Sequence, residues 1–416
     1  MIMAMKESGI EWVGLIPDTW SVIPNKYVMH KEKNLCEKWS GEDVMSLTMN
    51  GVIVRDLQNP TGKMPATFDG YQYVENGDLL MCLFDIDVTP RCVGRITHDG
   101  VTSPAYSNFK VHDNASRDYF YYYYLMVDNT KELLHLAKNL RHSFTEEQLG
   151  QLKVPMPPLS EQQAIADYLD ETCSKIDEII VEAKASINEY KELKQSVIDN
   201  ATMTGIHDSE MKNTDYVWFP EMPKSWDLVF ASLLFREDVR PVDANDVSLS
   251  LSQVDGLIPT DDMSERSLKS ATHDNWKHVI PDDLVLNRFK GHLGVFFASK
   301  YTGMVSFHYG VYHAIRDDVY AKYYEYLFHS TTYKNIFALK SNGITVGLQN
   351  LSNGNFYSVK ILHPTLDEQI EIVKYLDKRI AEIDSLIAEK ESLINDLEAY
   401  KKSLIYEVVT GKRRVV

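Results

Sequence analysis

Residues 157–198 read PPLSEQQAIADYLDETCSKIDEIIVEAKASINEYKELKQSVI, and residues 364–405 read PTLDEQIEIVKYLDKRIAEIDSLIAEKESLINDLEAYKKSLI. The second stretch repeats the pattern of the first at an offset of 207 residues (364 minus 157). Apolar residues recur at alternating steps of three and four, which is the heptad pattern of a helix that packs on another helix. Because neither stretch contains a glycine or proline after its opening prolines, each predicts one uninterrupted helix of about 40 residues, roughly 60 Å long.

Both predicted helices start after prolines. In the first copy Ser160 stands where an N-cap residue is expected, and Glu161 falls in the first turn, where the helix dipole favours negative charge. Asp367 is expected to play the capping part in the second copy. Lysines at 194, 390 and 401 interrupt the apolar stripes, so the seam between the helices should contain polar breaks.

The duplication extends beyond the helices. Trp12, Pro17 and Trp20 return 206 residues later, and VENGDLL (74–80) resembles VIPDDLV (279–285). The parts outside the helices combine β-rich stretches with tyrosine-rich helical ones, which predicts an α+β fold for each. The expected division is a globular domain at 1–154, a long helix at 155–206, a second globular domain at 207–361 and a second long helix at 362–416.

The two apolar stripes must be buried, and the simplest partner for each is the other. A pseudo-two-fold axis between the halves makes this pairing antiparallel, an intramolecular coiled coil with the globular domains at opposite ends of a rod. Pairing between two chains is the alternative, but the repeat within one chain favours the intramolecular arrangement. The residues expected to pack between the helices are Leu169, Ile176, Ile180 and Ile187 in the first copy and Leu376, Ile383, Ile387 and Leu397 in the second.

Length and composition limit the class of protein. A chain of 416 residues with 44% hydrophobic residues is globular and fits two or more domains. Its net charge of −17 is spread over all segments, which weighs against a broad nonspecific nucleic-acid surface but leaves room for a local groove. Four cysteines without zinc spacing, no signal peptide and no apolar run of about 18 residues predict a cytoplasmic protein without a membrane anchor.

Several local patterns then point to one family. They are SGIEW (8–12), IPDTW (16–20), PPLSEQ (157–162), DLVLNR (283–288) followed by Gly294, SFHY (306–309) and LIYEVVTG (404–411). In this order they resemble the DNA-specificity (S) subunits of Type I restriction–modification systems over the full chain. Each motif alone is weak, whereas the ordered and duplicated set is specific.

The resemblance implies a role in phage defence as the subunit that reads a bipartite site on double-stranded DNA. It implies that each recognition domain reads one half-site and that the paired helices act as a ruler and as the docking face for two modification (adenine methylase) subunits. Restriction (motor-nuclease) subunits would join through that complex. No cofactor is expected on this chain; S-adenosylmethionine, ATP and Mg²⁺ are expected in the partner subunits.

Base reading needs donors and acceptors in the major groove, and holding the duplex needs phosphate contacts. Arg288 in the second domain could fork onto a guanine edge. In the first domain Met81–Asp87 replaces the stretch around Arg288, and the basic residues come later. The candidate DNA-binding residues are Arg91, Arg95, Ser103, Tyr106, Lys138 and Arg141 in the first domain and Arg288, Lys290, His292, Ser306, His308, Tyr309, Lys340 and Thr345 in the second.

Each of these residues also has a structural interpretation, as part of a solvated or salt-bridged loop or of a strand-end turn. The tyrosines at 121–124 are expected to pack on a core edge and not to stack on bases. The repeated tryptophans are expected to fix the first segment of each domain, and Glu161-Gln162 and Glu368-Gln369 to cap helices.

The sequence contains none of the motifs of the associated chemistry. It lacks a P-loop, a glycine-rich methylase loop with an Asn/Asp-Pro-Pro-aromatic site, and a Pro-Asp…Glu-x-Lys nuclease pattern. A non-catalytic DNA-recognition subunit is therefore expected. The alternative is a coiled-coil scaffold or adaptor whose two α+β domains bind protein; a fused nuclease with an unrecognised site is a weaker third hypothesis.

Overall fold

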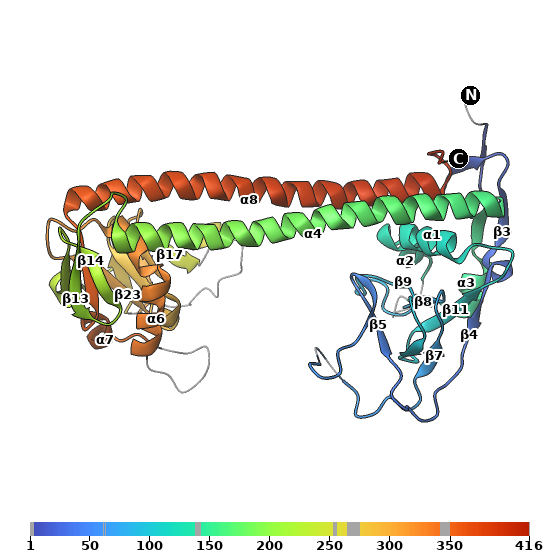
Figure 1. The fold of residues 1–416 in the computed structure, drawn as a ribbon, viewed down its shortest axis with the longest axis horizontal. Coiled ribbons are helices and arrows are strands. Elements are labelled where there is room, and N and C mark those ends of the chain that lie inside the picture. Colours follow the sequence, from blue (N-terminus) through green and yellow to red (C-terminus); the bar gives the residue numbers. More distant parts are fainter. Residues whose placement is uncertain are drawn as a thin grey trace. The chain divides into compact units, whose positions relative to one another are not determined.

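The computed structural model describes residues 4–60, 62, 64–137, 143–252, 256–263, 275–341 and 350–415 (Figure 1). Contacts divide the chain into two compact units. Unit 1 is Met1–Ala183 together with Ser392–Val416, and unit 2 is Lys184–Glu391. Each unit therefore holds one globular domain and a part of each long helix.

The globular domain of unit 1 is built on two four-stranded sheets, ordered β6-β5-β10-β7 and β4-β11-β8-β9. Two antiparallel pairs, β1 with β2 and β3 with β12, complete its strands. Its elements are β1 (Met5–Glu7), β2 (Leu15–Pro17), β3 (Ser21–Pro24), η1 (Asn25–Tyr27), β4 (Met29–Glu32), β5 (Val44–Thr48), β6 (Gly51–Val54), β7 (Gln72–Val74), β8 (Leu79–Met81), β9 (Val93–Arg95), β10 (Gly100–Thr102), β11 (Ser107–Val111), α1 (Arg117–Asn129), α2 (Glu132–Leu136), α3 (Glu146–Gln151) and β12 (Lys153–Met156).

The globular domain of unit 2 has the same plan. Its four-stranded sheets are ordered β18-β17-β22-β19 and β16-β23-β20-β21, and its two-stranded pairs are β13 with β14 and β15 with β24. Its elements are β13 (Met211–Tyr216), β14 (Phe219–Pro223), β15 (Asp227–Phe230), η2 (Ala231–Leu233), β16 (Phe235–Glu237), β17 (Val247–Ser252), β18 (Gly256–Pro259), η3 (Thr260–Asp262), β19 (Lys277–Val279), β20 (Leu284–Asn287), η4 (Gly291–Leu293), β21 (Phe296–Ala298), β22 (Gly303–Val305), β23 (Tyr309–Ala314), α5 (Ala321–Phe328), α6 (Thr331–Lys340), α7 (Asn353–Tyr357) and β24 (Lys360–His363).

The repeat in the sequence is thus a repeat of topology, strand for strand, and the predicted α+β fold with an internal duplication is confirmed. Each domain also has a glycine at the equivalent position, where the backbone of a neighbouring strand comes too close for a side chain. A side chain at Gly100 would meet the Asp43 carbonyl oxygen at 2.5 Å, and one at Gly303 would meet that of Val247 at 2.4 Å. At these points β10 and β22 run parallel to β5 and β17.

The two long helices are α4 (Leu159–Thr204) and α8 (Leu366–Val409), of 46 and 44 residues, and they lie side by side (Figure 1). In unit 1 Lys401 Nζ contacts Asp177 at 2.6 Å, and in unit 2 Lys194 Nζ contacts Asp384 at 2.7 Å. Seventeen residues forward on α4 (177 to 194) thus correspond to seventeen backward on α8 (401 to 384), so the helices are antiparallel. Both ion pairs are partly exposed and add little stability, but they repeat at the 207-residue offset and fit one register.

Most residues of the two apolar stripes are buried. Leu169, Ile176, Ile180 and Ile187 of α4 and Leu376 and Ile383 of α8 are buried, and Ile387 and Leu397 are half-buried. The two lysines at 194 and 401 are therefore polar breaks with carboxylate partners on the facing helix. No helix within the described ranges is long and apolar enough to cross a lipid bilayer.

The helix starts differ from the expectation. α4 begins at Leu159 and α8 at Leu366, so Ser160 and Asp367 lie inside the first turn and the prediction that they are N-caps is wrong. In α8 the cap is Thr365, whose hydroxyl accepts from the Glu368 N–H while the Glu368 carboxylate accepts from the Thr365 N–H. This reciprocal pair is a capping box. The sequence pattern Thr-x-x-Glu at 365–368 is typical of such a cap and could have predicted it.

Each helix start is tied to its domain by a fully buried glutamine. Gln162 Nε2 donates to the Pro157 carbonyl at 2.8 Å, and its Oε1 accepts from the Ser116 N–H at 2.7 Å. Gln369 makes the same bonds, to the Pro364 carbonyl and from the Tyr320 N–H, at 2.9 and 2.8 Å. These side chains satisfy backbone groups that would otherwise be buried without a partner.

The tyrosine-rich helices α1 and α5 bind both long helices. In unit 1 Tyr122 donates to Asp170 at the start of α4, and Tyr119 donates to the Val409 carbonyl at the end of α8. In unit 2 Tyr326 and Tyr323 donate to the corresponding Asp377 and Thr202. All four tyrosines are buried, which supports their interpretation as structural residues.

Replacing Gln162 by Met should destabilise unit 1, because the Ser116 N–H and the Pro157 carbonyl would stay buried without partners. The expected loss is about 1–3 kcal/mol for each unpaired group. Urea unfolding of the full chain, followed by circular dichroism, measures it. The neighbouring exposed Gln163→Met is the matched control, expected within about 0.5 kcal/mol of the wild type; equal stability of both variants would contradict the anchoring role.

Candidate nucleic-acid interface

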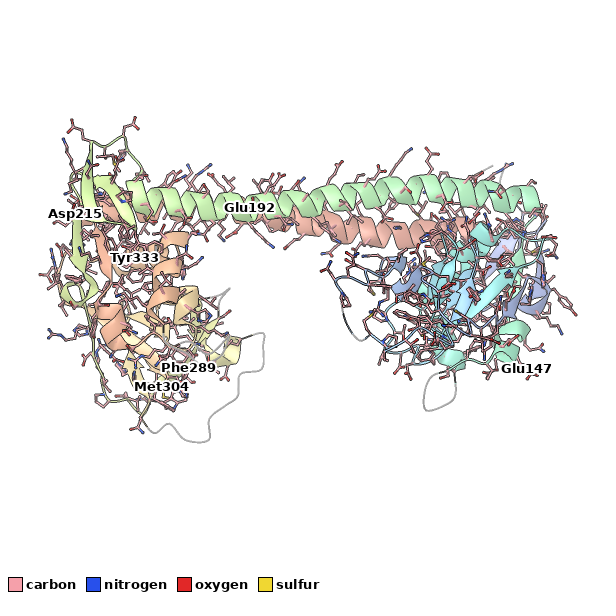
Figure 2. The ribbon with its side chains drawn as sticks, turned by 60° about the horizontal axis from the view of Figure 1, so that its bottom comes forward. Glu147, Glu192, Asp215, Phe289, Met304 and Tyr333 are labelled. Atoms are coloured by element: carbon pink, nitrogen blue, oxygen red, sulfur yellow. The ribbon has the colours of Figure 1, made fainter. Side chains whose placement is uncertain are left out.

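In unit 2 two loops meet at the ends of neighbouring strands, the β20–β21 loop and the β22–β23 turn. The His308 ring lies 3.8 Å from the Phe307 ring and 5.0 Å from the Phe289 ring, between centroids. The side chains of Phe289 and Phe307 are 39% and 53% exposed. Figure 2 shows Phe289 and Met304 farther from the long helices than Tyr333. These loops therefore place aromatic rings on a part of the surface away from the helix pair.

Arg288 points inward and does not belong to that surface. Its guanidinium donates to Glu237 at 2.6 Å and to Asn353 at 2.7 Å. Glu237 also contacts Lys277 Nζ at 2.7 Å, and the Tyr312 hydroxyl donates to Asn353 at 2.8 Å. In this structure the Arg288 guanidinium is engaged inside the domain, and its contact with a guanine stays a prediction.

The electrostatics of this cluster fit a structural role. Burial alone would raise the pKa of Glu237, but hydrogen bonds from Lys277 and Asn353 and the charge of Arg288 lower it overall. Burial lowers the pKa of Lys277, and its ion pair with Glu237 only partly offsets this. Glu237 thus holds two cations in place beneath the loop that follows β20.

The internal repeat explains why Arg288 faces inward. The Arg288 carbonyl accepts from the Leu351 N–H, and the Leu83 carbonyl accepts from the Phe144 N–H in unit 1. The two bonds are equivalent, so Arg288 occupies the position of Leu83, which is buried. A buried leucine in one half is replaced by a half-buried, paired arginine in the other.

The two candidate arginines of unit 1 are also engaged by the protein. Arg95 bridges Asp118 at 2.6 Å and Asp170 at 3.2 Å, and these carboxylates raise its pKa against the effect of burial. Arg91 donates to the Met49 and Val93 carbonyls and to the Tyr121 hydroxyl. Both arginines are thus salt-bridged or hydrogen-bonded within unit 1, and a DNA contact by either stays a prediction.

The other candidates fall into three groups. Ser103, Tyr106 and Ser306 are half-buried residues of strand-connecting turns, and Tyr309 is the half-buried first residue of β23. Lys340 donates to the Ser358 hydroxyl. Lys290 and His308 are exposed, His292 is half-buried, and Lys290 makes no ion pair with any residue that the structure describes. Lys138, Arg141 and Thr345 lie outside the described residues. Among the candidates that the structure describes, Lys290 and His308 are the ones brought to one exposed surface.

Sequence reasoning missed the two phenylalanines of this surface. Phe289 follows Arg288 directly, and Phe307 stands between Ser306 and His308, so both lie within stretches that were singled out for their polar residues. Unit 1 exposes Phe84 (37%) at the position equivalent to Phe289. Comparison of the two halves of the sequence could have shown that a phenylalanine recurs at this position, although not that it is exposed.

No group of three or more His, Cys, Asp or Glu side chains that could hold a metal ion occurs among the described residues. The interface is therefore characterised by aromatic rings, a lysine and a histidine on strand-connecting loops. Such side chains suit contact with base edges and phosphates.

The chain matches the family model described as the Type I restriction modification DNA specificity domain over residues 96–189 and 260–396. These two regions cover more than half of the chain, and they fall in both halves of the repeat. The chain belongs to this family of Type I restriction–modification DNA specificity proteins.

Two solved structures share the fold over nearly the whole chain. One, from a study of complex assembly and conformational transition of the type I R-M system, aligns with 96% of this chain and 99% of its own at 12% identity and a TM-score of 0.69. The crystal structure of the HsdS subunit from Thermoanaerobacter tengcongensis aligns with 96% and 98% at 13% identity and a TM-score of 0.54. The resemblance inferred from the sequence motifs is thereby confirmed.

Substitutions of Arg288 and Lys290 should have different effects, the first on the stability of the fold and the second on DNA binding. Arg288→Met removes a cation from the buried cluster and should lower the free energy of unfolding by about 1–3 kcal/mol, less than for a fully buried pair because the side chain is 23% exposed. Lys290→Met should leave urea unfolding unchanged and reduce the salt dependence of DNA binding by about one phosphate contact. The reverse pattern, with Lys290 needed for stability, would overturn this assignment.

Proposed function

We propose that this chain is the specificity subunit of a Type I restriction–modification complex and reads a bipartite site on double-stranded DNA, one half-site per globular domain. The observation that carries the proposal is the same two-sheet domain built twice, each with its own loop chemistry. Family membership supports a role in DNA specificity. The division into recognition domains at 1–154 and 207–361 and spacer helices at 155–206 and 362–416 is part of this proposal.

The helix pair would act as the ruler between the half-sites. Its antiparallel register and its two equivalent ion pairs, Lys401–Asp177 and Lys194–Asp384, fit an element of defined length. A helix of 44 residues is about 66 Å long. An element of this length suits a site with an unread gap between two half-sites.

Docking of two modification subunits is supported by apolar residues that repeat on the outside of the helices. Ile179 is 44% exposed and its counterpart Leu386 is 40% exposed. Leu193 and its counterpart Tyr400 are 44% and 47% exposed. Since each pair is related by the 207-residue offset, the chain offers two similar surfaces, which suits two copies of one partner. Restriction subunits would join through that complex.

The chemistry would belong to the partners. Methyl transfer from S-adenosylmethionine to adenine needs a glycine-rich loop and an Asn/Asp-Pro-Pro-aromatic site, and the motor needs a P-loop for ATP and Mg²⁺; the sequence contains neither. In this proposal the chain itself is non-catalytic and binds none of these cofactors. Its own contribution is to position the modification subunits on the chosen DNA site.

The test is to co-express this chain with its cognate modification subunit in a host that lacks adenine methylation, and then to map N6-methyladenine across the genome. The expected result is one split motif with a fixed gap and one methylated adenine in each half-site. Methylation without a split motif, or a stable complex that neither methylates nor binds DNA specifically, would contradict the proposal. The latter outcome would favour the protein-binding scaffold.

Lengthening both long helices by seven residues, inserted at facing positions, tests the ruler. Seven residues add about 10 Å to an α-helix, which corresponds to about 3 base pairs of DNA. The methylation motif should keep both half-sites and gain a gap of about that size. Insertion of seven residues into a loop of a globular domain is the control. An unchanged gap in the helix variant would contradict the hypothesis that the helices set the gap length.

A further inference from the structure

We propose that Phe289, Phe307 and His308 form an apolar patch that contacts the 5-methyl group of a thymine in the half-site read by unit 2. This inference rests on the proposed function and adds the chemical group that one domain recognises. The thymine methyl lies in the major groove and is the base-edge group that apolar side chains distinguish.

The three rings form one continuous surface drawn from two loops. His308 contacts both phenylalanines, at centroid distances of 3.8 and 5.0 Å, and both phenylalanines are more than a third exposed. Leu293, on the same β20–β21 connection, is 42% exposed. Exposed aromatic rings that gather on a surface are costly in water, which is typical of a binding surface.

The loop that carries Phe289 is constrained by the residues on both sides of it. Gly294 closes the loop in the left-handed region at φ +66°, where a side chain would also meet the Phe328 carbonyl oxygen at 2.5 Å. Arg288, fixed by Glu237 and Asn353, precedes Phe289 directly. Because the backbone on both sides of the loop is constrained, the rings can be presented to a groove with little loss of entropy on binding.

The arrangement favours contact with base edges over insertion between bases. A wedge that unstacks a base step is a single protruding apolar side chain. Here the rings are tilted against one another, with interplanar angles of 39° and 54°, so the cluster is far thicker than one ring. Lys290, exposed beside Phe289 and without an ion-pair partner among the described residues, is placed to contact a phosphate of the same DNA strand or its neighbour.

Unit 1 provides an internal comparison. It exposes Phe84 at the position of Phe289, but Pro104 and Ala105 stand where unit 2 has Phe307 and His308, and Asp85 stands in place of Lys290. The ring cluster and its cation are therefore specific to unit 2. Recognition of a thymine methyl through this patch should be confined to one half-site.

The experiment uses the full chain in complex with its modification subunit and DNA duplexes that carry the mapped site. Each thymine of both half-sites is replaced in turn by deoxyuridine, which removes only the methyl group. The wild-type complex should lose about fourfold in affinity at one or two positions of a single half-site, as expected from the burial of one methyl group. In the Phe307→Ala complex the same replacements should change affinity by less than about 1.5-fold.

The controls separate the possible failures. Phe230→Ala removes another exposed phenylalanine of unit 2 (45%) and should keep the full deoxyuridine penalty. If the wild type binds the split site specifically but shows no penalty at any thymine, or if Phe307→Ala keeps the penalty, this inference is wrong and the proposed function stands. If the wild type shows no sequence-specific binding, the proposed function itself fails. The deoxyuridine series with the wild-type complex tests the inference even if a variant fails to fold.

Discussion

The burial of two apolar stripes against each other is the constraint on which this protein depends. A helix of more than 40 residues with one apolar face is not stable alone in water, and most of its stability comes from what that face packs against. Here the face of α4 is covered by α8 and by the globular domains. The start of each helix is fixed by a buried glutamine, Gln162 or Gln369, and its far end receives a tyrosine hydroxyl from the other domain copy. Each globular domain is thus joined to both long helices by buried hydrogen bonds.

The duplication follows from this constraint. An antiparallel pair related by a pseudo-two-fold axis needs the same residues at both ends, and the structure uses them. Glu161 and Glu368 both accept from a buried tryptophan, Trp20 and Trp226. If either glutamate is replaced, the indole N–H of its buried tryptophan is left without this partner.

The sequence was informative where the signal is periodic or repeated. Heptads and the absence of glycine predicted both long helices, their pairing and the stripe residues from Leu169 to Leu397. It was less informative where the answer depends on contacts distant in sequence. Arg288 reads as an exposed loop arginine until Glu237 and Asn353 are brought beside it, 51 and 65 residues away. Arg95 is similar, since its partner Asp170 lies 75 residues further along the chain. The polar residue types drew attention away from Phe289 and Phe307, whose exposure only the fold reveals.

Comparison of the two halves distinguishes residues that build the framework from residues on the loops that differ between the domains. Positions that keep their residue type across the halves, such as the capping glutamines and the helix-binding tyrosines, contact the long helices. Positions that differ lie on strand-connecting loops: Leu83 against Arg288, and Pro104-Ala105 against Phe307-His308. A framework that is stabilised elsewhere allows these loops to change chemistry without unfolding the domain. Two copies of one domain can therefore differ in the chemistry of their loops, and an aromatic patch present in one copy alone is the kind of difference that this architecture permits.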